Sequence, residues 1–266
     1  MGERLDIELV LRGLARSRSQ AAQLIDAGRI SVNGKPVTKA AHKTDPSDQV
    51  ELSAGVDYVS RAGAKLAFAL TEFGIDVPAT VLDAGASTGG FTQVLLDRGA
   101  QEVFAVDVGH GQLASELASD SRVRNIEGVN LRDLTFEELT SLVGHEPAIG
   151  LVVADLSFIS ITLVLENLAR LAPSAPMVIL VKPQFEVGKH SLNASGVVTD
   201  WRERARALDQ VVDFCYSIGY SVKAMAQSPV LGTHGNVEYL LWIVSDEPGY
   251  REQWSEEIIQ LAKRVK

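Results

Sequence analysis

Short apolar runs alternate with segments of helical period from about residue 61 to residue 217. After a helix expected at 61–74, the apolar runs predict strands and the periodic segments between them predict helices. The expected strands lie at 79–83, 102–107, 123–127, 149–154 and 176–182, and the expected helices at 90–98, 112–118, 135–143, 159–171 and 201–217. This alternation predicts an α/β fold, with a parallel sheet covered by helices on both faces.

The last third of the chain departs from this alternation. Two strand-like runs, 220–226 and 237–244, follow each other with no helical pattern between them. Such a pair fits an antiparallel addition at the edge of the sheet. A final helix is expected at about 250–265.

The first 59 residues predict a separate small α+β domain. A short apolar helix should stop near Gly13, and a second helix at 20–27 can be capped by Ser17 or Ser19. Asn33-Gly34 between two short apolar runs is the signal of a type I′ hairpin, and a further strand is expected at 49–52. We therefore expect a domain at 1–59, a linker at about 53–60 and a larger domain at 61–266.

The net charge of −9 is unevenly distributed. Residues 60–266 carry 17 basic and 26 acidic side chains, whereas the segment 9–43 carries seven basic side chains and one acid. A local basic face attracts phosphate even on an acidic protein, although a solvated surface gives the same pattern. The residues predicted to bind RNA are Arg12, Arg16, Arg18, Arg29 and Lys35.

The sequence also argues against a membrane protein, a secreted protein and a metalloprotein. No run of ~18 apolar residues is present, so no membrane span is expected. The first 13 residues lack the pattern of a signal peptide, so a cytoplasmic location is expected. The only cysteine, Cys215, lies in a helical pattern and is expected to be a buried, inert thiol, and the five histidines lack metal-ligand spacing, so no metal is expected.

The stretch TVLDAGASTGGF at 80–91 is a strand, a glycine turn and the start of a helix. It lacks the lysine of a phosphate-binding loop and the glycine spacing of a dinucleotide fold. Asp107 ends the next apolar run at about the offset expected for a carboxylate that accepts ribose hydroxyls. This combination suits S-adenosylmethionine. The residues expected to bind this cofactor are Asp83, Gly85, Ala86, Ser87, Thr88, Gly89, Asp107, Val108, Asn130 and Asp155.

Two further strand runs end in charged residues, Asp155 and Lys182. The carboxyl ends of parallel strands line the ligand crevice of an open α/β sheet. Four charges at successive strand ends, with Asp83 and Asp107, therefore favour a functional site over solvated strand ends.

The motifs SRAGAKL at 60–66, DAGASTGGF at 83–91, ADLSF at 154–158, VKPQFE at 181–186 and GNVEY at 235–239 resemble the FtsJ-like RNA ribose 2′-O-methyltransferases. That family uses a Lys-Asp-Lys-Glu tetrad. The resemblance implies that the tetrad here is Lys65, Asp155, Lys182 and Glu238. Glu186 is the alternative fourth member, and Glu238 is preferred because it follows the Gly235-Asn236 turn at a strand start.

The segment 13–37, GLARSRSQAAQLIDAGRISVNGKPV, is similar to the S4-like RNA-binding motif of a small-subunit ribosomal protein. The two domains in this order resemble the TlyA family of haemolysin A-like rRNA methyltransferases. The resemblance implies a Rossmann-like class I methyltransferase domain, ribosomal RNA or ribosomal subunits as partner, and cytidine as the modified nucleotide. No protein partner is indicated.

A ribose hydroxyl is a weak nucleophile, so an enzyme must align it with the methyl group and remove its proton. Lys182 is the expected base, since burial and the nearby cation of Lys65 both favour a neutral amine. Asp155 would orient Lys182, with Lys65 and Glu238 in support. The alternatives are a methyltransferase acting on a base or a small molecule, a membrane-active haemolysin, and an RNA-binding protein without catalysis.

Overall fold

The computed structural model describes residues 2–26, 28–52, 58–245 and 249–264. The chain forms two compact units, Met1–Arg61 and Ala62–Lys266, and each is described by itself. Of the linker expected at 53–60, residues 53–57 lie outside the described residues, as do Ala27 and Val265 at the ends of two expected helices.

The first unit packs two helices, α1 (Leu5–Leu11) and α2 (Arg18–Asp26), with short strands. Ser17 begins α2, since its hydroxyl accepts a hydrogen bond of 3.2 Å from the backbone N–H of Gln20. The expected hairpin joins β2 (Ile30–Val32) to β3 (Lys35–Pro36), and β2 also pairs with β5 (Val50–Leu52). At its turn Asn33 and Gly34 both have positive φ, 52° and 73°, as a type I′ turn requires.

The structure adds a pair of strands that the pattern did not predict, β1 (Glu3–Arg4) and β4 (Lys43–Thr44). Each is two residues long, which is too short for an alternating pattern to appear. The core of the unit is a cluster of buried aliphatic side chains from α1, α2 and β2, among them Leu5, Leu9, Ile25 and Ile30.

The second unit is built on a seven-stranded sheet with the order β11-β12-β10-β9-β6-β7-β8. Its strands are β6 (Thr80–Ala84), β7 (Glu102–Asp107), β8 (Val123–Glu127), β9 (Leu151–Ala154), β10 (Met177–Val181), β11 (Ser221–Gln227) and β12 (Tyr239–Val244). The pairs from β8 to β10 are parallel, whereas β12 runs antiparallel to both β10 and β11. The predicted α/β fold with an antiparallel addition is confirmed, and the antiparallel strand lies one place in from the edge.

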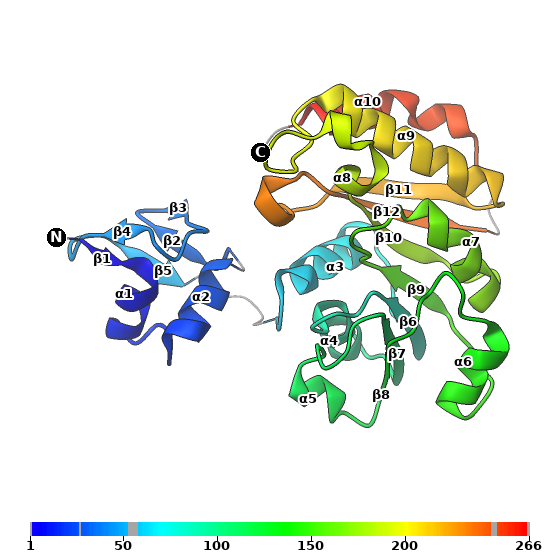
Figure 1. Cartoon of the computed structure of the whole chain (residues 1–266), viewed down its shortest axis with the longest axis horizontal. Coiled ribbons are helices and arrows are strands. Elements are labelled where there is room, and N and C mark those ends of the chain that lie inside the picture. Colours follow the sequence, from blue (N-terminus) through cyan, green and yellow to red (C-terminus); the bar gives the residue numbers. More distant parts are fainter. Residues whose placement is uncertain (1, 27, 53–57, 246–248, 265–266) are drawn as a thin grey trace. The chain divides into compact units, whose positions relative to one another are not determined.

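Helices follow the strands along the chain (Figure 1). They are α3 (Arg61–Glu72), α4 (Gly90–Asp97), α5 (Ser115–Ala118), α6 (Phe136–Val143), α7 (Thr162–Leu171), α8 (Pro183–Glu186), α9 (Trp201–Ser217) and α10 (Ser255–Lys263). Three short 3-10 turns, η1 (Lys189–Ser191), η2 (Thr233–Gly235) and η3 (Arg251–Trp254), complete the unit.

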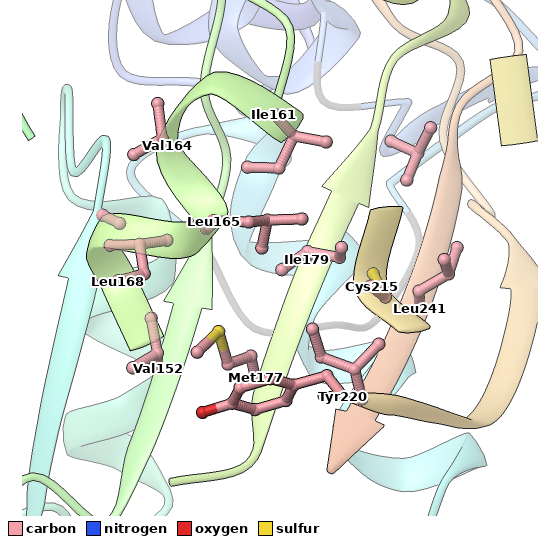
Figure 2. Close-up of a cluster of buried hydrophobic side chains, with 14 of the residues drawn as sticks. Val152, Ile161, Val164, Leu165, Leu168, Met177, Ile179, Cys215, Tyr220 and Leu241 are labelled. Carbon is pink, nitrogen blue, oxygen red and sulfur yellow. The ribbon is translucent and has the colours of Figure 1, made fainter. Parts of the chain in front are cut away.

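The largest core cluster lies between the sheet and the helices α6, α7, α9 and α10. Figure 2 shows part of it, with Ile179 and Leu241 of the sheet near Cys215 of α9. The thiol is fully buried, and burial raises the pKa of Cys215 to about 12. The expected burial of this cysteine is confirmed, and a thiol that stays protonated is a poor nucleophile.

Candidate functional site

The glycine turn follows β6 at the carboxyl edge of the sheet. Gly85 has φ of 88°, and a Cβ there would lie 2.8 Å from the carbonyl oxygen of Asp155. Gly89, which begins α4, has φ of 94°, and its Cβ would lie 2.3 Å from Leu117 Cδ1. Both positions therefore require glycine, because a side chain would strain the backbone and meet the loop after β9 at Gly85 or the α5 region at Gly89.

A pocket of about 420 Å³ opens beside this turn. Six of the residues expected to bind the cofactor line it: Gly85, Ser87, Asp107, Val108, Asn130 and Asp155. The other lining residues are Gln112, Leu131, Leu156, Ser157, Phe158, Ile159 and Val164. The pocket combines apolar walls with a few polar groups, as small-molecule sites do.

Asp107 ends β7 and faces the turn from the next strand. One carboxylate oxygen accepts a bond of 2.9 Å from the N–H of Ser87, and the other accepts a bond of 2.7 Å from the N–H of Gly109. Each carboxylate oxygen has a second lone pair, so Asp107 can still accept hydrogen bonds from a ligand.

Asp83 lies beneath the pocket and is not part of its lining. Its side chain is fully buried and accepts a hydrogen bond of 2.6 Å from the hydroxyl of Thr92 on α4. Burial, together with the charges of Asp155 and Asp107, raises the pKa of Asp83 to about 7, although the hydrogen bonds from Thr92 oppose that rise. Ala86, Thr88 and Gly89 likewise shape the turn without lining the pocket.

Lys182 and Asp155 meet at the ends of adjacent strands. Lys182 follows β10 and Asp155 follows β9, and Lys182 Nζ lies 2.6 Å from Asp155 Oδ1. The same amine donates a hydrogen bond of 2.7 Å to the hydroxyl of Ser157. Both charged side chains are largely buried, with 9% and 12% of their surface exposed.

Lys65 and Glu238 form a second buried pair, with 2.5 Å between Nζ and Oε2. Lys65 comes from α3 and Glu238 directly precedes β12. Gln184 of α8 donates to the other carboxylate oxygen of Glu238 at 3.3 Å. Because α8 follows Lys182 directly, this contact connects the Lys65–Glu238 pair to the helix next to Lys182.

Glu186, the alternative fourth tetrad member, binds other partners. It accepts hydrogen bonds from the hydroxyl of Ser160 at 2.5 Å and from the N–H of Ile161 at 3.0 Å. Burial raises the pKa of Glu186 above its usual range, and the two bonds oppose that rise. Glu186 therefore connects the end of α8 to the residues just before α7.

Sequence reasoning passed over seven residues of the pocket lining, of which Gln112, Ser157 and Phe158 are the polar or aromatic ones. Phe158 is 91% exposed, has φ of 66°, and its ring lies 5.3 Å from that of Phe185. A positive φ at a bulky exposed aromatic residue is a strained arrangement of the kind that gathers at functional sites. The signal in the sequence was that these residues lie in the loops that follow Asp107 and Asp155 at the strand ends.

The basic side chains of the first unit differ in their surroundings. Arg12 pairs with Glu8 at 2.7 Å and donates to the carbonyl oxygen of Asp48 at 2.7 Å. Arg18 pairs with Asp6 at 2.8 Å. The side chains of Arg16 and Lys35 are exposed and form no ion pair within the described ranges.

Comparison with known families matches both parts of the chain. The family described as FtsJ-like methyltransferase matches residues 58–244, and the S4 domain matches residues 3–50. The fold and the pocket at the carboxyl edge thus define a methyltransferase of the FtsJ-like class with an S4 domain before it.

Individual relatives narrow this class. The "16S/23S rRNA (cytidine-2'-O)-methyltransferase TlyA" of Mycobacterium tuberculosis is 49% identical over 246 residues, which is 90% of this chain and 89% of the relative. "Hemolysin A" of Brachyspira hyodysenteriae is 40% identical over 89% of this chain and 98% of its own. A solved hemolysin-like chain from Streptococcus thermophilus has a TM-score of 0.74 at 36% identity, covering 98% of this chain and 94% of that one. The chain belongs to the TlyA family.

The hemolysin name of some relatives raises the question of membrane insertion. None of the helices in the described ranges combines the length and the apolar character that crossing a membrane requires.

Proposed function

We propose that this protein transfers the methyl group of S-adenosylmethionine to the ribose 2′-hydroxyl of a cytidine in ribosomal RNA. One observation carries the proposal: the Lys182–Asp155 and Lys65–Glu238 pairs, of which Asp155 also lines the pocket of about 420 Å³ beside the glycine turn. The substrate comes from the Mycobacterium tuberculosis relative, which is named for cytidine 2′-O-methylation of 16S and 23S rRNA.

The polar groups that line the pocket suit S-adenosylmethionine. The N-terminus of α4 follows the glycine turn and would favour the negative charge of a carboxylate, and Asp107 can accept both ribose hydroxyls. Asn130 and Val108 lie in the same lining and would contact the adenine ring. When bound, the cofactor supplies a methyl group on a positively charged sulfur.

The proposed chemistry assigns a separate task to each charged residue. Lys182 would take the proton from the 2′-hydroxyl, and the bound cofactor would supply the methyl group that the ribose oxygen accepts. Asp155 would orient the amine and stabilise the ammonium that results, and it would also contact the cofactor because it lines the pocket. Ser157 fixes the amine from a second direction. Lys65 and Glu238 support the arrangement and hold α3, α8 and the start of β12 together.

The S4 domain supplies affinity for RNA in this proposal. The exposed cations Arg16 and Lys35 are the first candidates for phosphate contacts, with Arg12, Arg18 and Arg29 beside them. Phe158, exposed at the rim of the pocket, offers an aromatic surface on which an unstacked base can lie. The protein would act in the cytoplasm, where its ribosomal substrates are assembled.

The test is methylation of purified ribosomal subunits with S-adenosylmethionine labelled on its methyl group. The expected product is a ribose-methylated cytidine, identified by nuclease digestion and mass spectrometry. A methyl group on a base, or on no RNA at all, would refute the proposal.

A further inference from the structure

Gln112 bridges the two loops that hold Asp107. Its side-chain oxygen accepts a hydrogen bond of 3.2 Å from the hydroxyl of Ser87 in the glycine turn. Gln112 itself belongs to the loop after β7, and it lines the same pocket as Ser87 and Asp107. The glycine turn and the β7 loop are thus joined by a side chain as well as by Asp107.

Gly109 leaves the space that the Gln112 amide fills. A Cβ on Gly109 would lie 1.9 Å from Gln112 Nε2 and 2.8 Å from its Cδ. The backbone of Gly109 does not have a positive φ, so a side chain there would leave the backbone conformation unstrained but would displace the Gln112 amide. The same Cβ would also lie 3.1 Å from Asp107 Oδ1, so the amide lies close to the carboxylate.

These contacts link Asp107, Ser87, Gln112 and Gly109 in a closed circuit. The N–H groups of Ser87 and Gly109 each donate to one carboxylate oxygen of Asp107. Gln112 also connects Ser87 to Gly109, because it accepts a hydrogen bond from Ser87 and packs against Gly109. The orientation of the Asp107 carboxylate therefore depends on two loops whose separation Gln112 sets.

We propose that Gln112 is a positioning residue for the cofactor, which holds Asp107 in the orientation that accepts the two ribose hydroxyls, and that Gly109 is glycine to admit it. This inference rests on the proposed cofactor and adds a residue to its site.

The test is a set of binding measurements by calorimetry on the full chain without RNA. Gln112→Ala should weaken S-adenosylmethionine binding between about twofold and tenfold, the range for one hydrogen bond of ~0.5–1.5 kcal/mol. Gly109→Ala should have the same effect, because the new methyl group displaces the amide. In the double variant, Gly109→Ala should add little to Gln112→Ala, since the amide is already gone. Gln101→Ala is the matched control, because that amide donates to the carbonyl of Gly99 in the turn after α4 and the variant should bind normally.

A second readout separates positioning from a general loss of structure. Adenosine and 2′,3′-dideoxyadenosine, compared by competition against S-adenosylhomocysteine, differ only in the hydroxyls that Asp107 would accept. The preference for adenosine should shrink in Gln112→Ala and in Gly109→Ala. Unchanged affinity and preference in Gln112→Ala, or fully additive losses in the double variant, would overturn the inference and leave the proposed function standing. A wild-type chain that does not bind S-adenosylmethionine would refute the proposed function itself.

Discussion

Lys65 Nζ lies 2.5 Å from Glu238 Oε2, although the two residues are 173 positions apart in the chain. The pair is almost fully buried, with 8% and 2% of the two side chains exposed. A buried ion pair is poor evidence for stability, because desolvation of both charges offsets their attraction. The pair is joined through Gln184 to α8, the helix that follows Lys182. This position favours a role in the chemistry of the site.

The first prediction separates stability from activity at this pair. Glu238→Gln leaves the Lys65 charge buried without its partner and should lower the free energy of unfolding by about 3–5 kcal/mol. Lys65→Met should have a similar effect. The double variant Lys65→Met/Glu238→Leu should lose less than the two single losses combined, while all three variants lose methyl transfer. Chemical denaturation and the labelled methylation assay measure the two properties, and an active double variant would remove the pair from the catalytic site.

The second prediction concerns the base. Lys182→Met keeps the apolar stem of the side chain and removes the amine, so methyl transfer to ribosomal RNA should fall to background. Binding of S-adenosylmethionine should stay within about threefold, or ~0.7 kcal/mol, because the amine acts on the substrate hydroxyl. Single-turnover methylation and calorimetry provide the comparison. Near-normal turnover in this variant would show that another group removes the proton.

The third prediction concerns Asp107. Asp107→Ala removes the proposed acceptor of both ribose hydroxyls and the partner of two backbone N–H groups, so S-adenosylmethionine should bind at least roughly tenfold more weakly, about 1.4 kcal/mol. Asp107→Asn retains one acceptor oxygen and should lose less. Calorimetry without RNA measures both, and equal affinity in all three proteins would exclude Asp107 from the site.

The fourth prediction uses the raised pKa of Asp83, about 7. The folded chain keeps a proton on this carboxyl at pH values where the unfolded chain, with an ordinary pKa near 3.9, has lost it. The free energy of unfolding should therefore contain a part that decreases as the pH rises from about 4 to 7. Asp83→Asn retains an acceptor for Thr92 but does not titrate, so this part should disappear, with a change of up to roughly 4 kcal/mol. Urea denaturation across this pH range tests it, and parallel curves for the two proteins would contradict it.

Local pattern predicted the elements well because local forces decide them. The apolar runs between helical segments predicted the strands. Ser17, one of the two candidate caps, marked a helix start, and Asn33-Gly34 marked a turn; both features are confirmed. The two-residue strands β1 and β4 escaped because so short a segment has no period. Motifs spread over the chain predicted the family, and the comparisons confirm that family.

The side-chain partners in the site were beyond the reach of pattern. A strand-end position did not reveal that the Asp83 carboxyl turns inward to Thr92, nor that Glu186 binds Ser160. The bond from Ser87 to Gln112 spans 25 positions and depends on how two loops meet. Counting charges over 9–43 also left out Asp6 and Glu8, which lie just before that window and pair with Arg18 and Arg12.

The last prediction follows from that pairing and concerns the S4 domain. A cation that binds an RNA phosphate releases counterions, so its removal should lower the slope of log affinity against log salt by about 0.7–0.9. The exposed side chains of Arg16 and Lys35 form no ion pair within the described ranges, so Arg16→Ala and Lys35→Ala should each show this change.

Arg12→Ala should act differently, because its guanidinium pairs with Glu8 and donates to the carbonyl of Asp48. Its loss should lower the free energy of unfolding of the first unit by about 1–3 kcal/mol. It should also remove any phosphate contact that Arg12 makes. Arg170→Ala is the matched control, since that arginine lies on α7 in the second unit and pairs with Glu166. Affinity for ribosomal subunits, measured against salt for each variant, decides the matter. A slope that stays constant in Arg16→Ala and Lys35→Ala would show that the S4 domain meets its RNA through a different face.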